Sequence, residues 1–192
     1  MAGIESNPLQ LDPRYSTDAN SVRIGNLIYN ALLRYDERSQ LRPELADNWR
    51  MLDERTYLFE LRKDVFFHNG KRLTAADVRY TYESILDPGA ASPKRGQLRS
   101  LEAVQQTGTH QLRFRLRAPH APFIEQFTLG IVPAATGKTE PANRGTPPGS
   151  GPFRLDKLES GEKVTLSANP HYWEGRPPLA GIVFKVVPDA LV

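Results

Sequence analysis

The segment 41–88 constrains the fold more than any other part of the sequence, because strand, turn and helix signals follow one another in it without a gap. Large apolar residues alternate with polar ones in 47–51 and again in 56–61, and this period of two is typical of half-buried β-strands. The residues between the two runs, 53–55, favour a turn. We therefore predict a β-hairpin over 47–61.

A second turn and a helix follow the hairpin in the same segment. Asn69 and Gly70 predict a tight turn, because both residues tolerate positive φ at low cost. Thr74 and Asp77 have the spacing of a capping box, with Asp in the usual Glu or Gln position, and apolar residues recur after them at helical intervals. We predict a helix over 75–86.

The remainder of the chain alternates between strand-like runs and helical stretches. An apolar stripe that includes Val22 follows three possible N-caps, Ser16, Thr17 and Asp18, and predicts a helix over 19–33. Further expected elements are, in chain order, the end of a strand and a loop over 3–13, a hairpin of 101–106 with 111–117, a short helix over 119–129, a brief strand at 131–133, an exposed connection over 134–149, a hairpin of 153–157 with 164–168 and a strand at 182–187.

Composition narrows the class of protein only broadly. With 192 residues, 39% of them hydrophobic, the chain suits one compact domain or two small ones. The formal charge of +3 comes from scattered basic residues, which indicates a solvated surface and no nucleic-acid partner. The chain contains no cysteine, which excludes disulfides, thiolate metal sites and cysteine nucleophiles. No apolar run approaches the ~20 residues needed to span a membrane, and no signal-peptide core follows Met1.

The residues that could carry catalysis or bind a metal lack the accompanying motifs. The four histidines have no neighbour at metal-ligand spacing, so we expect neither a metal site nor a cofactor; they are His68, His110, His120 and His171. His68, beside the predicted turn at 69–70, is expected to be exposed. The carboxylates of Asp53, Glu54 and Asp87 lie at turns and a helix end without a nucleophile motif. We therefore expect a protein that is not an enzyme.

Several short blocks together make the chain recognisable. They are, in order, LDP at 11–13, LRKDV at 61–65, HNG at 68–70, LTAADV at 73–78, LDP at 86–88, GSGPF at 149–153, NPHYW at 169–173 and VPD at 187–189. This series resembles the family 5 extracellular solute-binding proteins, the receptors of ABC importers for dipeptides, oligopeptides, nickel chelates and related solutes. The resemblance covers nearly the whole chain and is specific for the family, but it does not specify the solute.

The resemblance implies a fold and a division into domains. Such receptors have two lobes around a ligand cleft, and a smaller α+β domain is inserted into the first lobe. We accordingly expect an α+β fold of the periplasmic-binding-protein type II kind, with mixed and antiparallel strands and a few helices. Residues 3–32 and 147–192 would form part of the first lobe and 33–146 the inserted domain, while the second lobe would be absent from this chain, as would the export signal.

The resemblance also implies a function. The chain would belong to the substrate-binding component of an ABC importer, located in the periplasm or outside the cell, with a lipid anchor as one possibility, and would deliver a peptide or related small solute to the permease. The alternative is a ligand-sensing domain of a transcriptional regulator with the same fold. Because the strands at 164–166 and 182–187 would lack their covering neighbours, self-association of the chain is also expected.

Two stretches are candidate ligand-binding sites on this template. The first consists of Tyr15, Ser16, Thr17 and Asp18, directly after the LDP block, where peptide-binding relatives bring groups to the substrate. The alternative role for Thr17 or Asp18 is to cap the following helix, and both roles can coexist. The second is Lys94, which stands where oligopeptide receptors have the tyrosine of a Ser-Pro-Tyr sequence. A lysine there replaces a packing surface by a cation and suits a solute with negative charge.

The glycine-rich block at Gly149, Ser150 and Gly151 is the third candidate. It lies between a loop and a predicted strand rather than between a strand and a helix, so it lacks the geometry of a phosphate-binding loop. Glycine in this position lets the backbone pass close to another segment or to a ligand. We therefore place this block near the junction of the lobe and the inserted domain.

Overall fold

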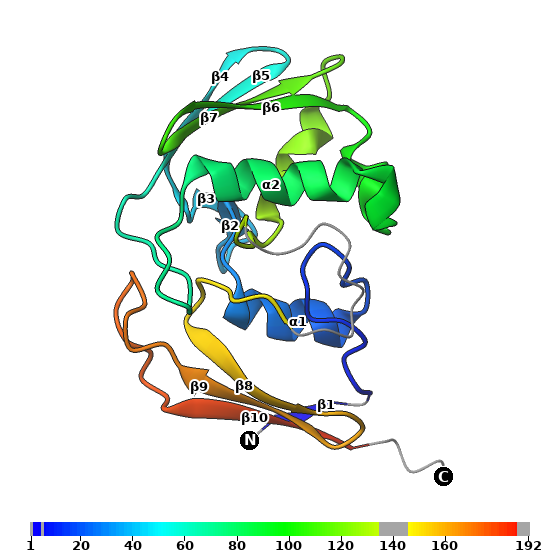
Figure 1. Ribbon diagram of the computed structural model, residues 1–192, viewed down its shortest axis with the longest axis vertical. Helices are drawn as coiled ribbons and strands as arrows, with labels where there is room; N and C mark the ends of the chain where they lie inside the picture. Colours follow the sequence, from blue (N-terminus) through cyan, green and yellow to red (C-terminus); the bar gives the residue numbers. More distant parts are fainter. Residues whose placement is uncertain (1, 5, 135–145, 188–192) are drawn as a thin grey trace.

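The computed structural model describes residues 2–4, 6–134 and 146–187. Its elements are β1 (Ala2–Ile4), α1 (Ala19–Ile28), β2 (Leu33–Tyr35), β3 (Leu41–Pro43), β4 (Ala46–Asp53), β5 (Thr56–Leu61), α2 (Ala75–Leu86), the 3-10 helices η1 (Pro88–Ala90) and η2 (Arg95–Leu98), β6 (Leu101–Gly108), β7 (Gln111–Leu116), the 3-10 helix η3 (Ala121–Thr128), β8 (Phe153–Glu159), β9 (Lys163–Ala168) and β10 (Gly181–Val186). Figure 1 shows the layers: the sheet β4-β5-β7-β6 lies over α2 at one end, and the sheet β1-β10-β9-β8 lies beside α1 at the other.

The predicted hairpin over 47–61 forms as β4 and β5, which pair antiparallel with Trp49 opposite Phe59. The predicted hairpin of β6 and β7 joins the same sheet, because β7 also pairs with β5. Leu112 and Phe114 on β7 are fully buried, as their alternation with polar residues predicts. Phe59 and Phe114 meet edge to face at 5.6 Å, a favoured geometry for aromatic pairs.

The helix predicted over 75–86 is confirmed as α2. The Asp77 side chain, fully buried at 0% exposure, accepts hydrogen bonds of 2.9 Å from both the backbone N–H and the hydroxyl of Thr74. It also accepts from Lys71 Nζ at 2.7 Å and from the Ala134 N–H at 2.8 Å. The predicted turn before the helix is confirmed by the φ of +82° at Gly70. Asp77 therefore holds the start of α2 to two other segments.

The helix expected over 19–33 is shorter than predicted, since α1 ends at Ile28. The carbonyl of Ile28 accepts a hydrogen bond of 2.8 Å from the Gly151 N–H, and Leu33 already pairs with β3 as part of β2. Val22 is 40% exposed and does not join the buried stripe. Asp18, one of the three possible N-caps, caps the helix by accepting from the Ser21 N–H at 2.8 Å.

Two other predicted elements take a different form. Residues 131–133 form no strand; the Ile131 N–H instead donates to the Asn30 carbonyl at 2.9 Å. The short helix predicted over 119–129 is the 3-10 helix η3, in which Phe123 and Phe127 are buried as expected. Residues 135–145 of the expected exposed connection lie outside the described residues, and Gly149 at its end is buried rather than exposed.

The second large sheet is built around the hairpin of β8 and β9, which turns at Gly161 with a φ of +78°. Strand β10 pairs antiparallel with β9, and β1 pairs parallel with β10. Ile24 and Ile28 of α1 belong to the same buried cluster as Val164 of β9. Helix α1 therefore covers one face of this sheet (Figure 1).

The buried apolar residues form two clusters. One holds Leu32, Ile131 and the core beneath the β4-β5-β7-β6 sheet, and the other holds Tyr29, Val132 and the core beneath the β1-β10-β9-β8 sheet. The chain thus passes from one cluster to the other at 29–32 and again at 131–132. None of the helices in the described part of the chain is long and apolar enough to cross a membrane.

His68 connects the two halves, and the expectation that it is exposed was wrong. Its ring nitrogen Nε2 lies 3.0 Å from the Gly151 carbonyl oxygen, and its backbone N–H donates to the Gly149 carbonyl at 2.7 Å. Burial lowers the pKa of the His68 ring below its ordinary value. The turn at 69–70 therefore presents His68 to the glycine-rich block, where the residue is half-buried.

Candidate functional site

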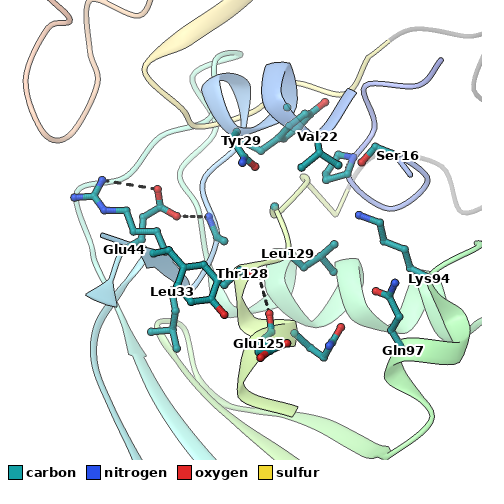
Figure 2. Close-up of a pocket in the computed structure, with 18 residues that line it drawn as sticks. Ser16, Val22, Tyr29, Leu33, Glu44, Lys94, Gln97, Glu125, Thr128 and Leu129 are labelled. Carbon is teal, nitrogen blue, oxygen red and sulfur yellow. Dashed lines mark hydrogen bonds and ion pairs between the residues drawn. The ribbon is translucent and has the colours of Figure 1, made fainter. Parts of the chain in front are cut away.

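A cavity of about 360 Å³ lies between α1, β2, η2 and η3. Figure 2 shows its walls: Val22 and Tyr29 on one side, Leu129 and Thr128 facing them, Lys94 and Gln97 at one end and Glu44 at the other. Most of these residues come from connections and helix ends, which depend on tertiary contacts for their positions. Lys94, Gln97 and Glu44 make the two ends of the cavity polar, while Val22 and Leu129 make its middle partly apolar.

Asp12 of the Leu-Asp-Pro block and the adjacent Arg14 fix the segment that precedes α1. The Arg14 side chain is buried and pairs with Asp12, from Nε to Oδ1 at 3.0 Å and from Nη2 to Oδ2 at 2.6 Å. Nη1 of Arg14 donates to the hydroxyls of Tyr80 and Ser84 on α2 at 3.3 and 3.4 Å. These bonds hold the segment before α1 against α2.

The loop that carries Lys94 is attached to the same segment. The Ser92 hydroxyl donates to the Arg14 carbonyl at 2.7 Å and accepts from the Lys94 N–H at 3.2 Å. Lys94 then forms the N-cap of η2, and its side chain extends into the cavity near Ser16 and Gln97 (Figure 2). The backbone of Lys94 is therefore fixed on both sides.

The Lys94 ammonium has no directly paired carboxylate among the residues that the structure describes. Burial lowers its pKa from the ordinary lysine value, and Asp12 opposes this effect only through its charge, since Arg14 already binds that carboxylate. Within the part of the chain that the structure describes, Lys94 forms no ion pair. An ammonium in a partly desolvated place without a partner is energetically unfavourable.

Glu44 lies at the opposite end of the cavity. Its carboxylate accepts hydrogen bonds of 2.7 Å from the Ala31 N–H and from the Asn30 amide. Burial raises the pKa of Glu44, while these two hydrogen bonds lower it in part. Arg34 Nη1 lies 4.0 Å from Glu44, and Arg34 also pairs with Glu174 at 2.6 and 2.8 Å. The charges at this end are therefore already paired with protein groups.

The structure brings two of the sequence-predicted site residues together, since Ser16 and Lys94 both line the cavity. Tyr15 packs beside the Arg14 guanidinium, with 5.6 Å between its ring centroid and Arg14 Cζ, and does not line the cavity. Thr17 is exposed outside it, and Asp18 caps α1.

The glycine-rich block meets another segment of the chain. A Cβ added at Gly149 would overlap the carbonyl oxygen of Ile28, and one at Gly151 would lie 2.6 Å from the Leu27 carbonyl oxygen. Ser150 is buried and donates to the Asn30 Oδ1 at 3.1 Å. None of these three residues lines the cavity. They fix the end of α1 instead.

Sequence reasoning missed Glu44, Arg34 and Gln97, all of which line the cavity. None of them stands in a motif, so no local signal marked them. The cavity can hold a polar organic solute through charge, hydrogen bonds and apolar contact. Among the described residues, no group of three or more His, Cys, Asp or Glu side chains could hold a metal ion.

The sequence matches a known protein family over most of its length. A family profile described as "Bacterial extracellular solute-binding proteins, family 5 Middle" matches residues 40–192. The chain belongs to this family. The resemblance found from the sequence blocks is thus confirmed, and so is the α+β, type II periplasmic-binding-protein fold.

Individual relatives support the same family assignment. The chain is 33% identical over 201 residues to the oligopeptide-binding protein AppA of Bacillus subtilis, and this alignment covers 99% of this chain and 37% of the relative. It is 36% identical over 196 residues to Protein XP55 of Streptomyces lividans, covering 97% of this chain and 35% of the relative. The chain therefore spans little more than a third of the length of these relatives.

Solved structures show the same fold. The structure of B. subtilis AppA in complex with a nonapeptide superposes with a TM-score of 0.92 at 32% identity, covering 98% of this chain and 40% of that chain. NikZ of Campylobacter jejuni in complex with Ni(L-His) gives 0.88 at 26% identity, covering 97% and 38%. Nothing in these comparisons supports the alternative of a transcriptional regulator's sensing domain.

Proposed function

We propose that this chain is part of the substrate-binding component of an ABC importer, which captures a peptide or a related small solute in a cleft and delivers it to the permease. The observation that carries the proposal is the cavity at which Ser16 and Lys94 meet, because both were expected to face the solute. Oligopeptide binding by AppA supports the peptide class. The protein acts as a receptor and not as an enzyme, in the periplasm or outside the cell, with a lipid anchor as a further proposal.

The two apolar clusters support a division into parts. We propose that 3–32 and 147–192 belong to the first lobe and 33–146 to an inserted domain. The chain passes from one cluster to the other at 29–32 and again at 131–132. The first crossing is close to the first proposed boundary, and the second crossing lies somewhat before the second boundary. The second lobe of the receptor would supply the opposite wall of the cleft.

The test is isothermal titration of the complete gene product that contains this chain, alongside the 192-residue chain itself, with a peptide library. We expect submicromolar binding by the complete product and much weaker binding by the chain. One wall of a cleft makes fewer contacts with the solute, while the free-energy cost of lost translational and rotational freedom is the same. A complete product that binds no peptide contradicts the peptide class. Equal submicromolar affinity of both proteins contradicts the need for a second wall.

A further inference from the structure

The cavity contains two cationic side chains in very different situations. Arg34 is 45% exposed and holds Glu174 through two hydrogen bonds of 2.6 and 2.8 Å. Lys94 is half-buried and forms no ion pair with any described residue. The positive charge that the protein leaves unmatched in this cavity is therefore that of Lys94.

Two neutral donors stand beside Lys94. Ser16 is 4% exposed and lines the cavity, and Gln97 lines it from η2. Figure 2 shows both side chains on the same side as the Lys94 ammonium. In the described part of the chain, neither the Ser16 hydroxyl nor the Gln97 amide forms a side-chain hydrogen bond. An ionised carboxylate has about four lone-pair sites and can accept from an ammonium, a hydroxyl and an amide together.

We infer that Lys94, Ser16 and Gln97 form a subsite for a carboxylate of the bound solute, so that the solute class is acidic peptides or other carboxylated small molecules. This inference rests on the proposed solute-binding function. The fixed loop favours it, because Ser92 and Arg14 hold the Lys94 backbone before the solute arrives, and a preorganised donor loses less freedom on binding.

The rest of the cavity determines the orientation of the solute. The carboxylates of Glu44 and Glu125 lie away from Lys94 along the walls (Figure 2). A solute carboxylate placed near Glu125 would meet like charge, which disfavours that orientation. At the β2 end, Arg34 is already paired with Glu44 and Glu174, so it offers a solute anion less than Lys94 does. The acidic group of the solute therefore points toward η2, and its neutral or positive part points toward β2 and η3.

The experiment measures peptide affinity in the complete gene product by titration calorimetry. One pair of probes is Ala-Ala-Glu-Ala amide against Ala-Ala-Gln-Ala amide, which tests an acidic side chain. The second pair is Ala-Ala-Gln-Ala with a free terminus against its amide, which tests the terminal carboxylate. We expect at least one acidic probe to bind about ten- to a hundredfold more tightly than its neutral partner, the range of a charge-assisted hydrogen bond.

The same pairs are then measured in Lys94→Met and in the control Lys185→Met. Lys185 is exposed on β10 and lies outside the cavity. Loss of the acidic preference in Lys94→Met alone supports the subsite. A preference that survives in Lys94→Met, or equal binding of acidic and neutral probes to the wild type, overturns it.

If neither peptide series binds, the peptide class of the proposed function is wrong, and a thermal-shift series decides the subsite. Glutarate and glutaramide are compared as additives at equal concentration. Stabilisation of the wild type by glutarate alone, absent in Lys94→Met, supports a carboxylate subsite for a solute that is not a peptide. Equal shifts in both variants, or no shift with glutarate, overturn the inference.

Discussion

The Asn30 side-chain amide donates a hydrogen bond of 2.7 Å to the Glu44 carboxylate, and this bond joins the segment after α1 to the connection between β3 and β4. Asn30 is 1% exposed, and its Oδ1 accepts from the Ser150 hydroxyl at 3.1 Å and from Trp173 Nε1 at 3.3 Å. Four segments that are distant in sequence thus meet at one amide. Because Glu44 also lines the cavity, the position of this wall depends on the same group.

Replacing Glu44 by Gln should lower the free energy of unfolding by about 1–3 kcal/mol, the usual effect of leaving a buried polar group without a partner. The new NH₂ group must face either the Ala31 N–H or the Asn30 amide, both of which are donors toward this carboxylate. Urea denaturation measures the change. The control Glu83→Gln, at an exposed ion pair of 3.8 Å, should change stability by less than about 1 kcal/mol. Equal losses in both variants would contradict the role of Glu44.

Gly149→Ala should destabilise the protein by about 3 kcal/mol or more, or abolish folding. The added Cβ would overlap the Ile28 carbonyl oxygen and lie 2.6 Å from the carbonyl carbon, and both are backbone atoms that cannot rotate away. At Gly96 an added Cβ meets no atom within 4 Å, so Gly96→Ala is the matched control with little expected effect. Thermal unfolding of the two variants and their soluble yield test this. Similar melting temperatures would show that the 149–151 segment can shift without cost.

Local signals in the sequence predicted the parts of the fold that local contacts determine. The capping box of Thr74 and Asp77 spans three residues, and it marked the start of α2 correctly. The end of α1 could not be predicted in the same way, because the Gly151 N–H that binds the Ile28 carbonyl comes from more than a hundred residues further along the chain. The exposed position expected for His68 was wrong for the same kind of reason.

The candidate site shows the same limit. Resemblance to a family pointed to Ser16 and Lys94, both of which line the cavity. Glu44 follows Pro43 and resembles any surface acid in sequence. Its burial results from donors at Asn30 and Ala31, which tertiary packing brings to it. A single sequence contains no signal for such a pair.

The stability of the protein should depend on pH through His68. Burial holds the pKa of its ring below 6.5, and the ring lies 3.0 Å from the Gly151 carbonyl oxygen, which requires an N–H at Nε2. The unfolded chain therefore binds a proton more readily, so the free energy of unfolding is highest above pH 6.5 and falls as the pH drops from 6.5 toward the lowered pKa.

The variant His68→Gln isolates this effect, because glutamine retains an N–H donor but does not titrate. Urea unfolding at pH values from about 7.5 to about 5 should show a smaller loss of stability in the variant than in the wild type. The pKa of His110 is also lowered, chiefly by desolvation, but that contribution is common to both proteins and cancels in the difference. Parallel pH profiles of the two proteins would refute the assignment to His68.

Asp77→Asn should reduce the free energy of unfolding by roughly 2–4 kcal/mol, because the buried carboxylate accepts several hydrogen bonds and carries a charge. Either orientation of the new amide places its NH₂ against the Ala134 N–H and the Lys71 ammonium or against the Thr74 N–H. The control is Asp64→Asn, at an exposed position. Chemical denaturation followed by circular dichroism compares the two. A loss in Asp77→Asn no larger than in the control would mean that the start of α2 does not depend on this group.

The 192-residue chain should also self-associate weakly through the edge of its second sheet. β8 is an edge strand in the order β1-β10-β9-β8, and Leu158 on it is 44% exposed, so both backbone groups and apolar surface are available for pairing with a second copy. Leu158→Lys should weaken association, since lysine on an edge strand opposes pairing. The control Leu9→Lys alters a leucine that is 79% exposed but lies in no strand. Light scattering after size-exclusion chromatography, over a dilution series, should give masses above 21.6 kDa that fall on dilution and on Leu158→Lys but not on Leu9→Lys. A constant mass of 21.6 kDa at every concentration would exclude pairing at this edge.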